Sequence, residues 1–253
     1  MDLGLRDRTV LVTGGSGGIG EAVARAFAAE DARVAVTYRS DEKSADRLAE
    51  ELGSGTGRAL AVRYDLAEPD TVQAAVERVR QDFGPLEVLV ANAVRWGARR
   101  PAERHFEQVA PEEWWPLIAE NLAPTIRTVQ FAAADMRGRG WGRIVLVSSQ
   151  VAVEGRRGQE FYSAFKSALH GFGRSLAADL GPDGVLVNVV CPGLTTTRRV
   201  LDGFPPGARR AETGRTATGR LSAPEDVAAA AVFLGSAANG NITGEVLAVT
   251  GGS

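Results

Sequence analysis

A tyrosine and a lysine stand four residues apart in the segment FYSAFKSALHGFGRSLAADL, at Tyr162 and Lys166. This spacing places both side chains on one face of a helix, one turn apart. A phenol has a pKa of about 10 in water, and a fixed ammonium beside it favours the phenolate and lowers that pKa. Such a pair can give a proton to a carbonyl oxygen or take one from an alcohol. These two residues are the first candidates for acid–base chemistry.

Lysine is rare in this chain, which makes its presence at this position informative. Lys43 and Lys166 are the only lysines among the 29 lysine and arginine residues. Because arginine fills the other basic positions, we infer that a guanidinium would not serve at position 166. The alternative is an amphipathic helix in which the two residues meet by chance.

A glycine-rich loop, TGGSGGIG, follows the apolar run TVLV at residues 13–20. The template G-x-G-x-x-G selects Gly15, Gly17 and Gly20, and the template T-G-x-x-x-G-x-G selects Gly14, Gly18 and Gly20. Between a strand and a helix, such a loop binds a pyrophosphate, because the first helix amides lack partners and glycine lets the backbone approach. A flexible turn is the alternative interpretation.

The end of the next apolar run indicates which dinucleotide would bind. A site for NAD needs a carboxylate about 20 residues after the glycines. Here Tyr38 takes that place and Arg39 follows, and a guanidinium suits a 2′-phosphate. Asp41 comes later and resembles a helix cap. We therefore expect NADP(H), with a solvated surface role for Arg39 as the alternative.

Short β-branched runs alternate with helical patterns along the chain, which predicts a doubly wound parallel sheet with helices on both faces. The expected strands are 9–13, 33–38, 59–65, 86–92, 142–149, 184–190 and 244–250. The expected helices are 18–30, 42–52, 69–83, 111–137, 161–180 and 224–236. No linker or repeat divides the 253 residues, so we expect one domain.

Composition disfavours several other classes of protein. The net charge of −2 offers no general attraction for nucleic acid or an anionic membrane, and no apolar run is long enough to span one. The start, MDLGLRDRTV, predicts no signal peptide. One cysteine, Cys191, fits a reducing cytoplasm, and two isolated histidines, His105 and His170, predict no metal site.

Together, the glycine loop, the Tyr-x-x-x-Lys pair and the strand–helix pattern resemble the short-chain dehydrogenase/reductase family over essentially the whole chain. The resemblance selects the register with Gly14, Gly18 and Gly20. It implies a single-domain Rossmann fold with a seven-stranded sheet over 1–253, often tetrameric. It also implies a cofactor-binding half over about 1–110, a catalytic half over about 111–253 and a mobile lid over about 194–222.

The same resemblance implies a catalytic set of Asn121, Ser149, Tyr162 and Lys166. Ser149 ends the fifth strand and would stabilise charge on a carbonyl oxygen; Ser148 is the competing candidate, turned to the other face by strand alternation. Asn121 precedes Pro124, which cannot donate to the carbonyl of Glu120, so the helix should be perturbed there. A purely local role for Asn121 is the alternative.

The resemblance also implies a set of residues that contact the cofactor. Asn92 matches an asparagine of the family's N-N-A-G motif, although Val94 replaces its glycine and leaves that loop in question. Cys191 has no histidine partner and is interpreted as a buried residue rather than a nucleophile. The expected cofactor contacts are Gly14, Ser16, Gly17, Gly18, Ile19, Gly20, Arg39, Ser40, Asp65, Leu66, Asn92, Ala93, Tyr162, Lys166, Pro192, Gly193, Thr195 and Thr197.

The sequence indicates the substrate less clearly than the cofactor. The expected lid carries six arginines, which indicate either a solvated basic loop or an anionic substrate or carrier: Arg198, Arg199, Arg209, Arg210, Arg215 and Arg220. The chain is similar to bacterial β-ketoacyl-acyl-carrier-protein reductases and polyketide ketoreductases. However, Ala134 and Ala178 stand where such reductases tend to carry basic residues.

We therefore expect a cytoplasmic NADPH-dependent ketoreductase. Its small-molecule substrate is a β-ketoacyl group on acyl-carrier protein or coenzyme A, or a secondary-metabolite ketone or quinone. The alternatives are an NAD-dependent alcohol or sugar dehydrogenase and a non-catalytic dinucleotide sensor or scaffold. The family's homotetramer would bury the helices 111–137 and 161–180 and the C-terminal segment, where Thr250 replaces a frequent aspartate; a homodimer is the other option.

Overall fold

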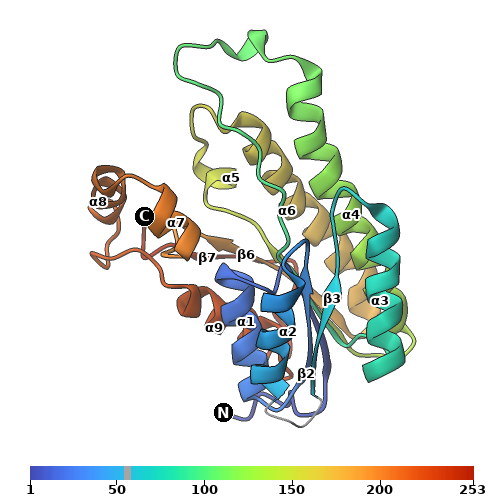
Figure 1. Ribbon diagram of the computed structural model, residues 1–253. Helices are drawn as coiled ribbons and strands as arrows, with labels where there is room; N and C mark the ends of the chain where they lie inside the picture. The colour runs from blue at the N-terminus through green and yellow to red at the C-terminus, as the bar shows by residue number, and fades with distance from the viewer. Residues whose placement is uncertain (54–57) are drawn as a thin grey trace.

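The computed structural model describes residues 1–53 and 58–253. Within these ranges, seven strands form one parallel sheet in the order β3-β2-β1-β4-β5-β6-β7 (Figure 1). The strands are β1 (Thr9–Thr13), β2 (Arg33–Tyr38), β3 (Ala59–Arg63), β4 (Val88–Ala91), β5 (Gly142–Val147), β6 (Val185–Pro192) and β7 (Val246–Val249). This is the doubly wound Rossmann arrangement that the alternation of strands and helices predicts.

Helices cover both faces of the sheet. On one face lie α1 (Gly18–Ala29), α2 (Glu42–Gly53) and α9 (Pro224–Leu234). On the other lie α3 (Pro69–Phe83), α4 (Pro111–Arg137) and α6 (Glu160–Leu180). Among the described residues, short helices complete the fold: α5 (Val151–Glu154), α7 (Arg198–Gly203) and α8 (Pro206–Thr213), with 3-10 turns at Phe106–Gln108 and Gly181–Asp183.

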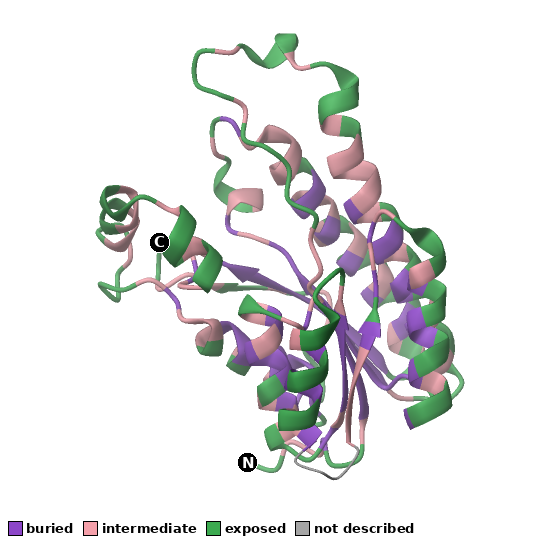
Figure 2. Ribbon diagram, viewed as in Figure 1, coloured by how far each residue is buried: buried purple, intermediate pink, exposed green. Residues whose placement is uncertain are grey.

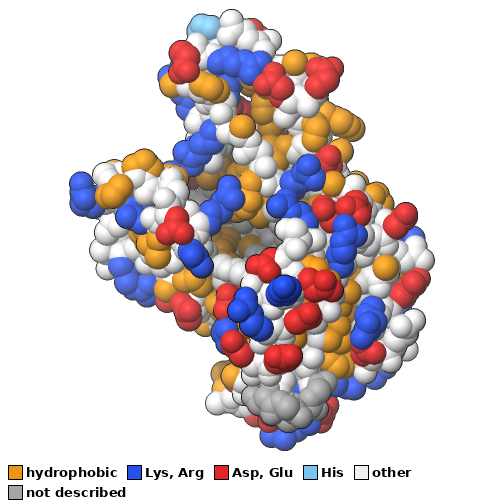
Figure 3. All heavy atoms as spheres, viewed as in Figure 1, with side chains coloured by type: hydrophobic (Ala, Val, Ile, Leu, Met, Phe, Trp, Pro, Cys, Tyr) orange, Lys and Arg blue, Asp and Glu red, His pale blue; other side chains and the backbone are white. Residues whose placement is uncertain are grey.

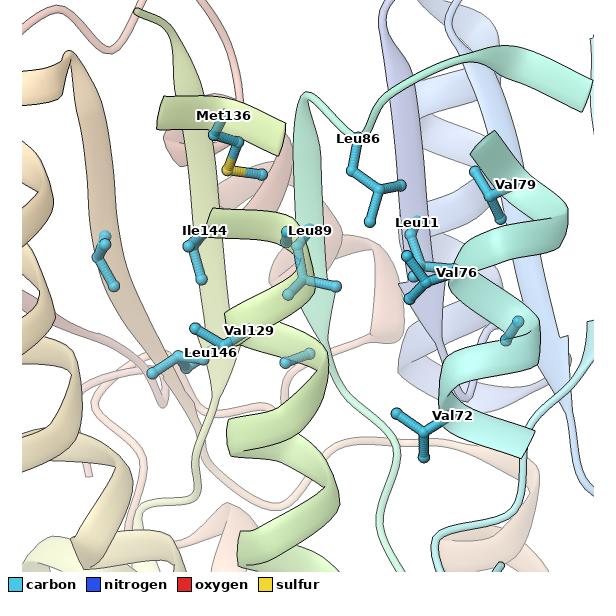
Figure 4. Close-up of a cluster of buried hydrophobic side chains, with 14 of the residues drawn as sticks. Leu11, Val72, Val76, Val79, Leu86, Leu89, Val129, Met136, Ile144 and Leu146 are labelled. Carbon is cyan, nitrogen blue, oxygen red and sulfur yellow. The ribbon is translucent and has the colours of Figure 1, made fainter. Parts of the chain in front are cut away.

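The core consists of two apolar clusters, one on each face of the sheet. Successive residues of β1 alternate between them: Val10 and Val12 belong to the cluster under α1 and α9, and Leu11 to the cluster under α3 and α4. Figure 4 shows part of the second cluster, in which Leu11 and Leu89 of the sheet meet helix residues such as Val76 and Val129. Both faces of each central strand are buried, as Figure 2 shows, which explains why the strands are continuous apolar runs.

The expected strands and long helices are confirmed, with ends that differ by a few residues. The sequence analysis missed the short helices α5, α7 and α8, which are too brief for a clear apolar period. Helix α4 continues through Pro124, so the expected perturbation does not break it. The division near residue 110 and the lid over 194–222 remain predictions.

The fold brings the carboxyl ends of the strands to one edge, where ligands bind in open α/β sheets. From β1 the chain continues to β2 and β3 on one side of the sheet. It then returns to β4, which starts the other half. The strand order therefore reverses between β1 and β4. The glycine loop follows β1, and the segments after β4, β5 and β6 carry Asn92, Ser149 and Gly193 at the same edge. No helix within the described residues is long and apolar enough to span a membrane.

Candidate active site

The glycine loop makes a tight turn from β1 into α1. Gly14 and Gly18 have φ values of +64° and +57°, which favour glycine. A Cβ on Gly20 would lie 2.1 Å from the Gly14 carbonyl oxygen, so only glycine permits this packing. These are the three glycines of the T-G-x-x-x-G-x-G register. At Gly17, by contrast, a Cβ would meet no atom within 4 Å, so the backbone there faces open space.

Asn92 fastens this loop to the end of β4. Its Nδ2 donates to the backbone oxygens of Thr13 and Gly14 at 3.1 and 3.2 Å. The Thr13 hydroxyl in turn accepts from the backbone amides of Asn92 and Ala93, each at 3.0 Å. The Asn92 side chain therefore holds the glycine turn in place. The sequence analysis expected only that Asn92 contacts the cofactor.

A hollow of about 220 Å³ lies beside the loop, at the ends of β2 and β3. The expected cofactor contacts Arg39, Asp65 and Leu66 line it, as does Tyr38. Gly14, Ser16 and Ala93 complete the expected residues found there. The Asp65 carboxylate accepts from the Ala67 amide at 2.9 Å, which holds the start of this segment. Ser40 is exposed and does not line the hollow.

A larger cavity of about 750 Å³ opens over the carboxyl ends of β5 and β6. Figure 3 shows the surface hollowed near the middle of the molecule, with lysine and arginine side chains at its edges. Expected site residues from four separate parts of the chain line it: Ile19, Ser149, Tyr162, Pro192, Gly193, Thr195 and Thr197. Thr197 caps α7, and its Cγ2 would lie 3.4 Å from a Cβ on Gly18, so the cavity adjoins the start of α1.

Tyr162 and Ser149 meet in this cavity. Burial raises the pKa of Tyr162 to about 12, and a side-chain hydrogen bond with Ser149 acts in the opposite direction. The phenol is therefore fully protonated at neutral pH. The expected acidification by Lys166 is wrong for this arrangement, because the loss of hydration outweighs the neighbouring groups.

Lys166 is buried behind the tyrosine rather than exposed in the cavity. Its side chain is 3% exposed, and Nζ donates to the Val147 carbonyl oxygen at 2.6 Å. Nζ lies 5.9 Å from the centroid of the Tyr162 ring, so the helical spacing does bring the two residues together. Burial lowers the pKa of Lys166 to about 7, so the amine is only partly charged at neutral pH.

Asn121 is fully buried in α4 and does not line the cavity. Its Oδ1 accepts from the Arg95 amide at 2.7 Å, and its Nδ2 donates to the Arg95 and Leu117 carbonyls at 3.0 and 2.8 Å. The side chain thus ties the segment after β4 to α4. Both Nδ2 hydrogens and the Oδ1 atom are engaged in these bonds, and the catalytic role expected for Asn121 remains a prediction.

Cys191 lies at the end of β6 and is 2% exposed. Burial raises the pKa of its thiol to about 11, so a thiolate is absent at neutral pH. This agrees with its interpretation as a small buried residue.

Comparisons with known proteins agree with this architecture. A family model described as enoyl-(acyl carrier protein) reductase matches residues 14–253. The cis-4-hydroxycyclohexanecarboxylate dehydrogenase of Sinomonas cyclohexanicum is 38% identical over 97% of this chain and 96% of its own length. The 3-oxoacyl-[acyl-carrier-protein] reductase FabG of Escherichia coli is 34% identical, with the same coverage of 97% and 96%. A solved short chain dehydrogenase/reductase family protein superposes with a TM-score of 0.86 at 33% identity, covering 100% of this chain and 98% of that one.

The chain belongs to the short-chain dehydrogenase/reductase family.

As a short-chain dehydrogenase/reductase, the protein is an oxidoreductase of alcohol and carbonyl groups that uses a nicotinamide dinucleotide. The residues at the loop fit such a group. The first amides of α1 have no partner within the helix, and Gly17, its N-cap, offers no side-chain bond to them. Because the backbone at Gly17 faces open space, a pyrophosphate can approach it closely. The two hollows on either side would hold the remaining parts of the dinucleotide.

The sequence analysis of this short-chain dehydrogenase/reductase missed much of the cavity wall, including three aromatic or basic residues. Trp96, Arg99 and Phe204 all line the larger cavity. Trp96 stacks on the Tyr162 ring, with centroids 5.4 Å apart and planes 16° from parallel. These residues lie outside the helices and strands, so no periodicity marked them. Trp96 and Arg99 follow the N-A-V segment within a few residues and Phe204 stands in the expected lid, so aromatic and basic character at these places was the available signal.

Proposed function

We propose that the protein is an NADPH-dependent carbonyl reductase in which Tyr162 donates the proton to the ketone oxygen. The observation that carries this proposal is the meeting of Tyr162 and Ser149 in a cavity next to the glycine loop. The dinucleotide supplies the hydride that the ketone carbon receives. A phenol with a pKa of about 12 is present as the acid, which is the form that reduction requires.

The other polar residues would support this proton transfer. The Ser149 hydroxyl, which lines the cavity with Tyr162, would donate to the substrate oxygen and stabilise the charge that develops on it. Lys166, held by the Val147 carbonyl, would keep an amine beside the phenol as a proton store. Asn121 would act through the segment that it holds, since its side chain is bonded to Arg95 and Leu117.

The preference for NADPH is supported by the hollow at the end of β2. Arg39 lines it and is exposed, and Tyr38 fills the position where an NAD site places a carboxylate. The nearest acidic residue of α2, Glu42, accepts a hydrogen bond from the Tyr38 hydroxyl at 2.9 Å. A guanidinium with its donors in solvent can bind a 2′-phosphate with two parallel hydrogen bonds.

The relatives' names suggest two substrate classes for this chain. One relative is named for a 3-oxoacyl group on a carrier protein and the other for a cyclic hydroxy acid. The name of the relative that acts on a cyclic hydroxy acid also suggests another candidate function for this chain, the oxidation of an alcohol. Alanines at positions 134 and 178 support the smaller substrates over a docked carrier protein. A homo-oligomer built at the sheet edge is supported by β7, where Leu247 is 40% exposed.

The proposed function is tested by a screen of ketones, ketoacyl thioesters and the matching alcohols with each coenzyme. Consumption of NADPH on a ketone, with weaker activity on NADH, is the expected result. Faster reduction of NAD⁺ by an alcohol would favour the second candidate. Binding of the dinucleotide without turnover on any compound would instead indicate a non-catalytic sensor.

Replacing Arg39 with Gln should raise the KM for NADPH roughly 10- to 100-fold and leave the KM for NADH almost unchanged, because one charge-assisted contact to the 2′-phosphate is lost. The measurement is steady-state kinetics on one ketone with both coenzymes. Arg47→Gln is the matched control, since Arg47 is exposed on α2 and bonds to Lys43 and Ser44. An equal rise in both KM values would contradict the assignment.

Replacing Ser149 with Ala should lower kcat roughly 100- to 1000-fold, the usual effect of removing a donor to a developing oxyanion. Ser148→Ala is the comparison variant, because the Ser148 hydroxyl bonds instead to the Lys166 carbonyl and to His170 Nε2, at 3.0 and 2.8 Å. We expect it to lower the melting temperature more than kcat. Equal losses of kcat in the two variants would remove the distinction between the serines.

A further inference from the structure

The cavity beside Tyr162 has a largely apolar wall with arginines at its margin. Its apolar residues come from several elements: Trp96, Leu117, Phe161 and Phe204. Arg99, Arg156 and Arg199 also line it, and Asp202 is the only carboxylate among the lining residues. Positive charge therefore dominates the polar part of the wall.

Among the described residues, ion pairs distinguish Arg156 from the other two arginines of the wall. Arg156 donates to both carboxylate oxygens of Glu212, each at 2.7 Å, so its charge is neutralised. The Asp202 carboxylate lies 3.5 Å from the guanidinium of Arg198, a residue that does not line the cavity. In the part of the chain that the structure describes, Arg99 and Arg199 have no carboxylate within ion-pairing distance. Neither guanidinium is closed off by an ion pair, although the Glu212 carboxylate also interacts electrostatically with Arg99.

Aromatic rings hold both guanidinium groups in place. Arg199 lies over the Trp96 ring, with its Cζ 4.7 Å from the centroid, and Trp96 stacks on Tyr162. Arg99 lies over Phe204 at 5.4 Å. The Gln159 amide, turned with its oxygen toward Arg99, accepts from Nε and Nη2 at 3.0 Å. Stacking of this kind fixes the plane of a guanidinium and leaves N–H donors at its edge for an anion.

The short helix α7 links the two arginines to one wall of the cavity. Arg199 and Phe204 stand at opposite ends of the short helix α7, which corresponds to about 8 Å along its axis. Arg99 reaches this helix from the segment after β4 by its contact with Phe204. Both arginines line the cavity that contains Tyr162, so both are available to a ligand bound there.

The remaining arginines of 194–222 do not compete for this role. Arg198, Arg215 and Arg220 pair with Asp202, Glu154 and Asp226. Arg209 donates to the Leu201 carbonyl oxygen at 2.7 Å, and Arg210 is exposed and does not line the cavity. Of the six arginines, Arg199 is the one in the cavity wall, and the other five are paired, hydrogen-bonded or exposed away from it.

We propose that the ketone substrate carries a carboxylate that binds Arg99 and Arg199, while its apolar body lies against Trp96 and Phe161. This inference rests on the proposed function, because it assumes that a carbonyl reaches Tyr162. A free keto acid supplies one carboxylate, whose two oxygens can accept hydrogen bonds from guanidinium N–H groups. The stack of Arg199 on Trp96 and of Trp96 on Tyr162 couples recognition of the carboxylate to the position of the phenol.

The test compares keto acids with their neutral methyl esters. The probes are 4-oxocyclohexanecarboxylate and 5-oxohexanoate, each with its methyl ester, and acetoacetyl-coenzyme A as a thioester. We expect kcat/KM to favour the acids roughly 10- to 100-fold, the effect of hydrogen bonds to a charged group. Arg99→Gln and Arg199→Gln should each reduce that ratio at least several-fold and leave the KM for NADPH unchanged. Arg198→Gln and Arg210→Gln are the matched controls and should preserve it.

Calorimetric binding of the same compounds to the NADP⁺ complex separates this inference from the proposed function. Reduction of acids and esters at equal rates would overturn the carboxylate site and leave the reductase intact. A preference for acetoacetyl-coenzyme A that survives both arginine substitutions would also overturn it. Binding of the acids alone, lost in Arg99→Gln and Arg199→Gln but without any turnover, would support the site and contradict the reductase.

Discussion

Replacing Tyr162 with Phe should lower kcat by about 1000-fold or more, because the proton donor is lost, a step worth roughly 100- to 10,000-fold. The ring and its stack on Trp96 remain, so the cavity keeps its shape. Affinity for the dinucleotide, measured by fluorescence titration, should change little. Turnover within tenfold of the natural protein would show that another group donates the proton.

The pH profile of the natural protein provides a second check on Tyr162. With a phenol pKa of about 12, the acid form stays fully populated from pH 6 to 9, so ketone reduction should show no loss from this group. Alcohol oxidation needs the phenolate and should rise about tenfold per pH unit through this range. A reduction rate that falls with an apparent pKa near 7 would show instead that another titrating group controls the step.

Replacing Lys166 with Met should lower kcat/KM by at least about 100-fold, since the buried amine beside the phenol disappears while the length of the side chain is kept. Lys43→Met is the matched control, because Lys43 is the other lysine and is exposed on α2. The control should retain full activity. If Lys166→Met retained it too, the amine would have no part in the reaction.

The same substitution has an effect on stability that depends on pH. The pKa of Lys166 is about 7 in the folded protein and about 10.4 in an unfolded chain. The unfolded state therefore binds more protons between these values, and the natural protein gains stability as the pH rises from about 7 to 10, by a few kcal/mol. Lys166→Met lacks this gain. Its melting temperature relative to the natural protein should be highest at or below pH 7 and should decline toward pH 10; a constant difference would contradict the burial of the amine.

Much of the fold was predictable because its signals are local. Continuous apolar strands and periodic helices identify a doubly wound sheet, since burial on both faces requires apolar residues at successive positions. The structure gives a physical reason for a glycine at position 20 of the loop: a Cβ there would collide with the Gly14 carbonyl. The face shared by Tyr162 and Lys166 follows from helical geometry alone.

The surroundings of these residues depended on tertiary packing. The sequence placed an ammonium next to a phenol, but only the fold shows that Nζ turns to the Val147 carbonyl and that burial raises the phenol pKa. Asn92 and Asn121 were expected at the cofactor and in the catalytic set. The structure shows that Asn92 Nδ2 donates to the glycine loop and that the Asn121 amide bonds to the backbone of Arg95, contacts between distant segments that no sequence spacing reveals.

The sequence by itself therefore determined the family fold, the glycine turn and the Tyr–Lys pair, because each depends on backbone geometry over a few residues. Only the tertiary structure decided which of the many arginines remain free in the cavity. Glu212 neutralises Arg156 from a distant helix, whereas Arg199 rests on Trp96, about a hundred residues earlier in the chain. Charge pairing between distant segments is set by packing, and packing is not encoded in local periodicity.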